Sequence, residues 1–187
     1  KLAIGLIQDQ RNLEFIPSSG HYLYSAFVFS PSPLNSIDTY YHWNTDFRHY
    51  LKIVENRWLW LANQFQYRIS TTSTPLPEKA SLGSKSTLRG IPLDRYISNQ
   101  IAIFRSELRS VIIRTRLFGL PVKGGMGIFG DTGRTGNNFA RLFETPTRFG
   151  WGVSFFGSYF TDDFLGAVDL GFSRKERALY ISLAHAF

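Results

Sequence analysis

The chain has 187 residues, of which 16% are aromatic and 19% are charged, and it contains no cysteine. This length suits one domain, and no stretch approaches the run of about 18 apolar residues that a membrane-spanning helix requires. The formal net charge of +7 comes from basic residues that are scattered among aromatic ones without a Lys/Arg run. The composition therefore gives no reason to expect a nucleic acid partner, and a basic pore lining or loops near anionic lipid explain the charge as well.

The mean hydropathy is only −0.13 despite the many aromatic residues. This combination is typical of a membrane β-barrel, in which only alternate residues of each strand face lipid. The absence of cysteine fits a protein that crosses an oxidising compartment without forming disulfides. Because the chain starts at Lys1 without Met, we expect either that a signal peptide has been removed or that further sequence precedes it.

Alternation of apolar and polar residues recurs along the whole chain and predicts nine strands, whereas no segment combines helical periodicity with caps. In chain order the predicted strands are Lys1–Asp9, Tyr22–Ser30, Thr39–Lys52, Arg57–Ser70, Asn99–Ile113, Leu120–Asp131, Phe149–Thr161, Phe164–Ser173 and Ala178–Phe187.

The third and fourth predicted strands show the alternation most clearly. One face of each is apolar and aromatic, and the other carries amides and charges, as at Gln64 and Arg68. A soluble sandwich also alternates, but its apolar face is richer in Val, Ile and Leu. The outward, lipid-facing set is expected to be Tyr41, Trp43, Phe47, Leu59, Leu61, Phe65 and Tyr67.

The connections differ in length. The stretch Thr71–Ser98 is long and holds three prolines, and Gly133–Arg148 is expected to be irregular, whereas Pro17–Gly20, Glu55–Asn56 and Thr161–Asp163 are short turns. Short turns on one side and long loops on the other are typical of outer-membrane barrels.

The last eleven residues predict a strand that stops on a large aromatic residue. Leu179, Ile181, Leu183 and Phe187 share one face of this strand. A soluble domain rarely ends on a large apolar residue in mid-strand, because a frayed terminus does not bury that side chain. Read alone, the segment equally suits the last strand of a soluble sandwich, but in a barrel it would close the wall and serve as an assembly signal.

Three enzyme-like patterns fail on their context. Gly125–Gly130 matches a nucleotide-binding pattern but lies within a strand and opens no helix. Asp131-Thr132-Gly133 resembles an aspartic-protease turn, yet the chain has no second copy, so only a dimer could supply the paired carboxylates. The four histidines lack metal-ligand spacing, and His42 with Asp46 is expected to line a polar interior. We therefore expect no enzyme activity, no cofactor and no metal.

Five motifs occur in a fixed order. They are Asp9-Gln10-Arg11-Asn12 leading to Pro17–Gly20, Leu82-Gly83 leading to Leu88-Arg89-Gly90-Ile91, Ser106-Glu107-Leu108-Arg109, Ile128–Gly133, and the terminal Phe187. Together they resemble the C-terminal barrel of the BamA/TamA-like outer-membrane family, also called bacterial surface antigens. The chain departs from the family pattern at Leu82, where the family has Gly, and at Ile91, where it has an aromatic residue.

The resemblance implies an all-β fold, an antiparallel transmembrane β-barrel over residues 1–187. With eight to nine strands, this chain is expected to be the C-terminal half of a barrel of about sixteen strands. The missing strands would come from upstream sequence or from another copy in a homo-oligomer. A small closed barrel of eight strands is an alternative if the first strand lies outside the wall. An open sheet with bare edges is not viable in lipid.

The resemblance also implies that loop 71–98 folds into the barrel, where Arg89 of the Leu88-Arg89-Gly90 motif meets the inner-wall acids Glu107 and Asp131. Strand parity independently allows both acids to point inward, Glu107 together with Arg105 and Arg109. Gly90 would permit a close turn beside the wall.

The implied function is non-catalytic insertion or translocation of polypeptide in the bacterial outer membrane. The lipid bilayer and a polypeptide client would be the partners, and the first and last strands would form a weak seam. One alternative is a barrel that anchors or exports an attached domain such as a patatin-like lipase. Another is a passive pore that prefers anions.

Overall fold

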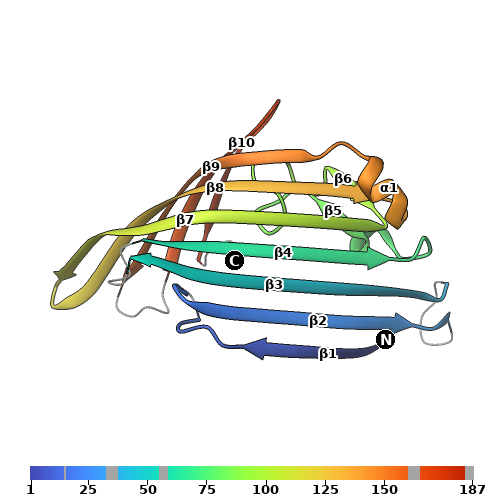
Figure 1. Cartoon of the computed structure of the whole chain (residues 1–187), viewed down its shortest axis with the longest axis horizontal. Helices are drawn as coiled ribbons and strands as arrows, with labels where there is room; N and C mark the ends of the chain where they lie inside the picture. Colours follow the sequence, from blue (N-terminus) through green and yellow to red (C-terminus); the bar gives the residue numbers. More distant parts are fainter. Residues whose placement is uncertain (15, 33–37, 55–58, 160–164, 184–187) are drawn as a thin grey trace.

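The computed structural model describes residues 1–14, 16–32, 38–54, 59–159 and 165–183. These residues form one nine-stranded sheet in which every neighbouring pair is antiparallel, in the order β1-β2-β3-β4-β7-β8-β9-β10-β11 (Figure 1). The strands are β1 (Leu2–Asp9), β2 (Gly20–Ser30), β3 (Tyr40–Val54), β4 (Leu59–Ser70), β7 (Gln100–Leu117), β8 (Leu120–Gly136), β9 (Arg148–Tyr159), β10 (Leu165–Ser173) and β11 (Arg177–Ser182).

The expected all-β fold and all nine expected strands are therefore confirmed, with shifted boundaries. The strands β7 and β8 extend beyond the predicted ranges, to Leu117 and Gly136, and form a long hairpin. The last strand ends at Ser182, and the predicted terminal residue Phe187 lies outside the described residues.

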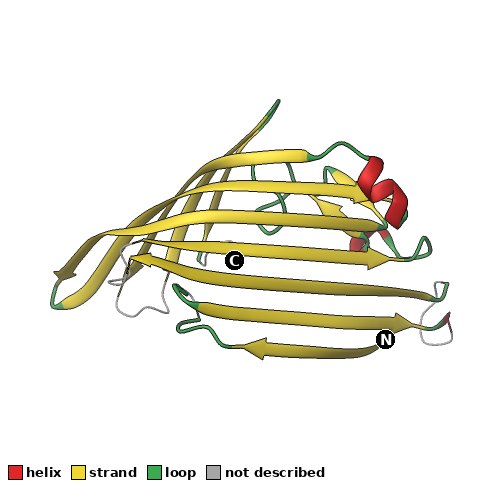
Figure 2. Cartoon of the chain, in the orientation of Figure 1, coloured by secondary structure: helices red, strands yellow, loops and turns green. Residues whose placement is uncertain are grey.

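The expectation that Gly133–Arg148 is irregular was wrong in part. Strand β8 continues through Gly136, and a short helix α1 (Phe139–Glu144) follows it (Figure 2). The side chain of Asn138 caps this helix by accepting a hydrogen bond from the Arg141 backbone N–H. Six residues are too few to produce a helical periodicity in the sequence, which explains the error.

The sheet is open in the described residues. Strand β1 is one edge and β11 is the other, and no ladder joins them. The alternative of a small closed barrel of eight strands was wrong, because β1 belongs to the sheet and pairs with β2 from Leu2–Phe29 to Asp9–Tyr22. Figure 1 shows that the sheet curves, with β10 turned behind β8 and β9.

The two faces of the sheet differ in chemistry. On the outer face, Phe47 of β3 lies opposite Phe65 of β4, which lies opposite Phe104 of β7, and all three rings are exposed. On the inner face, the neighbouring row joins Gln64 to Arg105 and Arg105 to Asp131, and these side chains are buried. The strand parity predicted from the sequence is therefore confirmed for β3, β4 and β7.

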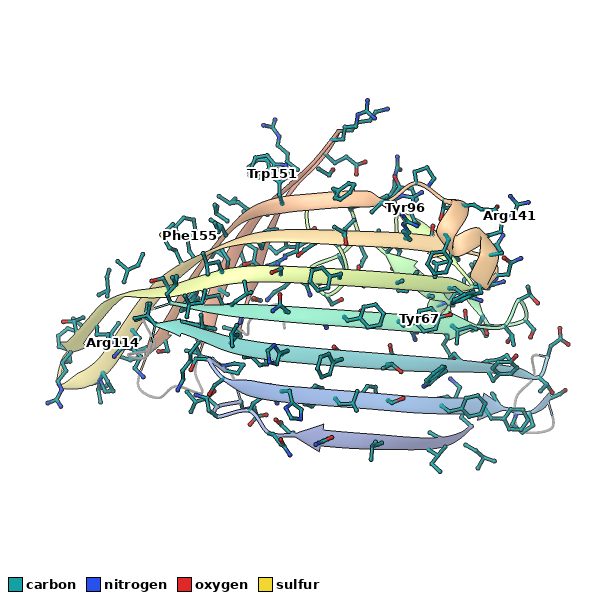
Figure 3. All side chains as sticks on the ribbon, viewed as in Figure 1. Tyr67, Tyr96, Arg114, Arg141, Trp151 and Phe155 are labelled. Carbon is teal, nitrogen blue, oxygen red and sulfur yellow. The ribbon has the colours of Figure 1, made fainter. Side chains whose placement is uncertain are left out.

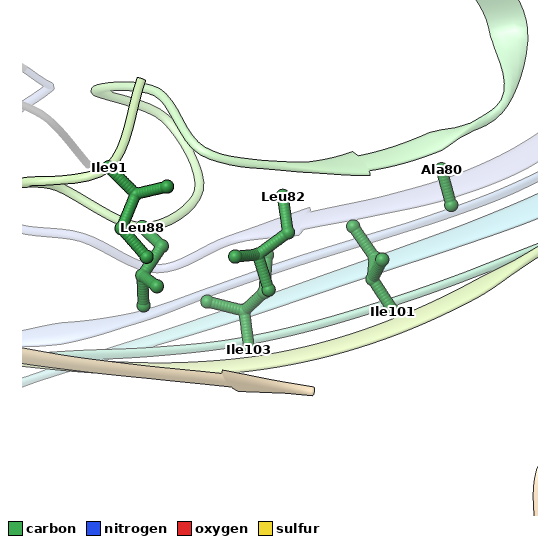
Figure 4. Close-up of a cluster of buried hydrophobic side chains, with 6 residues drawn as sticks. All are labelled: Ala80, Leu82, Leu88, Ile91, Ile101 and Ile103. Carbon is green, nitrogen blue, oxygen red and sulfur yellow. The ribbon is translucent and has the colours of Figure 1, made fainter. Parts of the chain in front are cut away.

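The connection between β4 and β7 packs against the inner face. It contains a 3-10 turn, η2 (Leu76–Glu78), and a small hairpin of β5 (Ala80–Leu82) with β6 (Tyr96–Ser98). Figure 4 shows the apolar cluster that this segment forms with strand β7. Ala80, Leu82, Leu88 and Ile91 from the connection meet Ile101 and Ile103 from β7, and all six are buried. This cluster attaches the connection to the sheet by burial of apolar area.

Among the described residues, no helix has the length and hydropathy needed to traverse a bilayer.

Candidate functional site

The side chain of Arg89 lies at the centre of a buried ionic cluster on the inner face. Its Nε and Nη2 atoms donate to the two carboxylate oxygens of Asp131 at 2.8 and 2.9 Å. Its Nη1 atom donates to Glu107 Oε2 at 2.7 Å, and its backbone N–H donates to Asp131 Oδ2 at 3.1 Å. The structure thus brings together the loop arginine and both of the acids that the sequence singled out.

The geometry at Arg89 suits a guanidinium better than an ammonium. The two-pronged contact with Asp131 matches the fixed fork of an arginine, and Nη1 remains available for a second carboxylate. The guanidinium also lies over the ring of Phe129, with Cζ 3.4 Å from the ring centroid. Burial disfavours the charged guanidinium, but the hydrogen bonds and charges of Asp131 and Glu107 outweigh it and raise the pKa of Arg89.

Strands β7 and β10 supply further charges to the cluster. Arg109 donates from Nε to Glu107 Oε1 at 3.0 Å, and Asp169 of β10 lies 4.0 Å from Arg89 Nη1. Arg105 Nε lies 3.5 Å from Asp131 Oδ2. Each of these side chains is at most 1% exposed. The charges of these three arginines are therefore matched by those of three carboxylates, which limits the cost of burying them.

Arg105 also binds the backbone of the connection. Its Nη2 atom donates to the carbonyl of Lys85 at 2.9 Å, and Nη1 donates to the carbonyl of Ser86 at 3.4 Å and to Gln64 Oε1 at 3.0 Å. Sequence analysis placed Arg105 on the inner face but assigned it no contact with the loop. Strand parity was the available signal, whereas the loop carbonyls that it meets depend on the loop conformation.

Glycines allow the loop backbone to lie directly on β9 and β10. Gly90 has φ +84°, and a Cβ there would lie 2.6 Å from the carbonyl carbon of Phe172. A Cβ at Gly150 would lie 2.0 Å from the carbonyl oxygen of Arg89, and one at Gly171 would lie 2.5 Å from the Gly90 nitrogen. The close turn expected at Gly90 is present, and it requires small residues on the sheet as well as in the loop.

The last strand holds the other side of this turn. The hydroxyl of Tyr180 in β11 accepts a hydrogen bond from the Gly90 N–H at 3.2 Å and donates to the Ile91 carbonyl at 3.2 Å. Lys85 donates to Ser182 of the same strand. Burial lowers the pKa of the Lys85 amine, although the nearby Asp169 carboxylate opposes this shift.

Sequence reasoning missed Tyr180 and Asp169 as partners of the loop. Both lie at inward parity on strands whose other face is apolar, and Asp169 and Tyr180 are register partners. A carboxylate between Val168 and Leu170 was the sequence signal for Asp169. Tyr180 gave no comparable signal, because a tyrosine occurs on either face of such a strand.

The remaining residues of the expected site lie where the strand parity predicts. Leu88 is buried in the cluster of Figure 4. Leu179, Ile181 and Leu183 lie on the outer face at 58%, 78% and 75% exposure.

The motif at the start of the chain forms the turn between β1 and β2. Arg11 Nη2 contacts Asp9 Oδ2 at 2.6 Å, and the Asn12 side chain accepts from the backbone N–H groups of Ser18 and Ser19. Gly20 has φ +99°, and a Cβ there would lie 2.1 Å from the Gln10 carbonyl oxygen. The motif therefore shapes this turn, far along the sheet from Arg89.

The enzyme-like patterns have structural partners. The Asp131 carboxylate accepts hydrogen bonds from Arg89. The Asp46 carboxylate accepts hydrogen bonds from Gln64 at 2.9 Å and from Arg48 at 2.7 Å. His42 Nδ1 lies 3.9 Å from Glu78 of η2. Within the described ranges, no group of His, Asp and Glu side chains has the geometry of a metal site.

No protein-family model matches this chain, and no curated protein matches it either. What the site itself defines is a buried ionic cluster that fastens a long connection to the inner face of an antiparallel sheet.

Proposed function

We propose that this chain forms part of the wall of an outer-membrane β-barrel of the BamA/TamA-like kind, and that it acts in polypeptide insertion or translocation without catalysis. The observation that carries the proposal is the distribution of polarity across the sheet. Aromatic and aliphatic side chains are exposed on the outer face, whereas the inner face buries charged side chains. A sheet of a soluble protein has the opposite arrangement, with its apolar face packed and its polar face in water.

The ionic cluster supports the same proposal. In a barrel interior, an arginine held by two carboxylates would keep a long connection inside the wall without exposing its charges to lipid. The connections also support it. Because successive strands are antiparallel, the long segment between β4 and β7 lies at the end of the sheet opposite the tight turn between β7 and β8, at Phe118–Gly119. This asymmetry is typical of outer-membrane barrels.

The two edge strands of the sheet need further hydrogen-bond partners in the proposed barrel. The backbone N–H and C=O groups along the free sides of β1 and β11 would be costly in lipid without partners. We therefore propose that further strands, from upstream sequence or from another copy, complete the wall. The seam beside β11 would open for a client strand, which adds to an exposed edge by backbone hydrogen bonding.

Single cysteines test the proposed membrane wall cleanly, because the natural chain has none. Phe65→Cys and Phe104→Cys lie on the outer face, and Phe118→Cys lies at the tip of the β7–β8 hairpin, where the ring is 90% exposed. In membranes that are accessible from both sides, a membrane-impermeant maleimide should label Phe118→Cys rapidly and the other two only after denaturation. Equal labelling of all three in intact membranes would refute the proposal.

A further inference from the structure

A cavity of about 720 Å³ lies at the rim of the sheet where β9 begins and β10 ends. The ladder between these strands starts at the pair Gly150–Ser173, so Arg148 and Phe149 extend beyond the end of β10. The turn from β10 to β11, residues 174–176, forms another side of the cavity, and Tyr96 of the inner connection forms a third. The lining residues of the cavity therefore come from the inner connection, from the rim and from the outer face.

The polar side of this cavity is strongly basic. Arg95, Arg148, Arg174 and Lys175 line it, and the only carboxylate among its lining residues is Glu176. Arg95 Nε lies 3.8 Å from Glu176 Oε1, so one cation is partly neutralised.

One of the basic residues is held in place. The Arg148 guanidinium lies over the ring of Tyr96, with Cζ 3.7 Å from the ring centroid. The electrostatic character of the cavity suits a multiply charged anion, and a fixed guanidinium suits the geometry of a phosphate.

The other side of the cavity is aromatic and faces outward. Phe149 and Trp151 are 62% and 61% exposed, and Trp151 stacks on Phe172 of β10 with ring centroids 5.0 Å apart. Figure 3 shows Trp151 on the outer side of β9, with Phe155 further along the same strand. Amphipathic aromatic side chains gather at the level of lipid headgroups in membrane proteins.

We infer that this cavity binds the phosphorylated headgroup of an anionic lipid, with Arg148, Arg174 and Lys175 around the phosphate and the acyl chains along Phe149 and Trp151. The inference rests on the proposed location in a membrane. A free phosphate satisfies the cations alone, whereas a lipid also covers the exposed rings with apolar area. The direct continuity of basic and aromatic surface in one cavity therefore favours a lipid.

The test is titration of the full-length protein in micelles of an uncharged detergent with dihexanoyl phosphatidate below its micelle concentration. Inorganic phosphate is titrated in parallel, and binding is measured by calorimetry. The double variant Arg174→Gln/Lys175→Gln removes two exposed cations from the turn. Its matched control, Arg114→Gln/Arg116→Gln, removes two exposed cations from the other end of the sheet, where Figure 3 shows Arg114.

Removal of the two turn cations should weaken phosphatidate binding roughly twenty-fivefold, about fivefold for each cation, and the control should leave it unchanged. Trp151→Ala should weaken binding of phosphatidate but not of inorganic phosphate, whereas Phe155→Ala should change neither. Circular dichroism checks that each variant keeps its sheet content.

Three outcomes would overturn the inference. They are no phosphatidate binding by the natural protein, an equal loss in the control double variant, and inorganic phosphate binding as tightly as phosphatidate. The last result would identify the cavity as a site for a free anion. The cysteine labelling tests the membrane location, and the titration tests the lipid site. If the labelling shows that the protein does not form a membrane wall, the same titration is run without detergent, so that failure of the membrane proposal is distinguished from failure of the lipid proposal.

Discussion

The change Arg89→Ala should release the connection between β4 and β7 from the inner face. It removes the two-pronged contact with Asp131 and the bond to Glu107, and it leaves both carboxylates buried at no more than 1% exposure. Loss of one partner of a buried ion pair costs about 3–5 kcal/mol. Arg109 still donates to Glu107 and Arg105 still lies 3.5 Å from Asp131, so neither carboxylate is left without a cation. Water entering the released space would reduce the cost further, so the lower end of the range is expected.

This free energy concerns local opening of the connection, and it can be measured by amide hydrogen exchange. The Arg89 N–H is bonded to Asp131, the Gly90 N–H to Tyr180, and the Asp94 N–H to Gly83. A peptide that spans residues 83–94 therefore reports opening directly. When reclosing is fast, about 3 kcal/mol corresponds to an increase in exchange of roughly two orders of magnitude.

The matched control is Arg141→Ala on helix α1. Arg141 forms an ion pair with Glu144 at 3.0 Å, but its side chain is 68% exposed, and pairs of this kind contribute little to stability. If exchange in residues 83–94 rises no more in Arg89→Ala than in Arg141→Ala, the ionic cluster does not hold the connection. A double change of Arg89 and Asp131 to alanine should add little to either single change, because the two residues share one interaction.

Three further changes test the two faces and the turn. Leu61→Arg on the outer face should destabilise the inserted protein by about 2–4 kcal/mol in urea unfolding if the site lies near the bilayer midplane. Phe118→Arg at the exposed hairpin tip is the control and should cost much less. Similar costs of the two changes would contradict the assigned outer face. Gly150→Ala should lower the thermal unfolding temperature, at a cost of about 1–3 kcal/mol, because its Cβ would lie 2.0 Å from the Arg89 carbonyl oxygen. Gly130→Ala is its control, since a Cβ there meets nothing within 4 Å, and equal effects would argue against close packing of the turn. Tyr180→Phe should weaken the turn by about 0.5–1.5 kcal/mol for each lost hydrogen bond and speed exchange at Gly90, and an unchanged rate would mean that β11 does not support the loop.

Much of the fold follows from patterns of short range. The period of two in β3 and β4 identified the strands and assigned Phe65 and Gln64 to opposite faces, because side chains alternate along any strand. The same argument placed Glu107 and Asp131 inward. Their meeting with Arg89 was expected only through the family resemblance, since parity gives the direction of a side chain but no partner for it.

The parts that could not be predicted depend on register and curvature. The contact of Tyr180 with Gly90 joins residues that are 90 positions apart, and it exists because the sheet curves enough to bring β11 beside the turn. The glycines Gly150 and Gly171 were equally hard to interpret, because their role is defined by the backbone that approaches them. No local pattern in the sequence encodes these distances.

The partners of the Arg89–Gly90 turn also set an order of events in folding. The acids that hold Arg89 follow it by 18 and 42 residues, and the tyrosine that receives the Gly90 N–H belongs to the last described strand. Hairpins of neighbouring strands can form from local contacts, whereas the turn finds its full set of partners only after β11 has joined β10. We therefore expect docking of the connection to be a late step of folding.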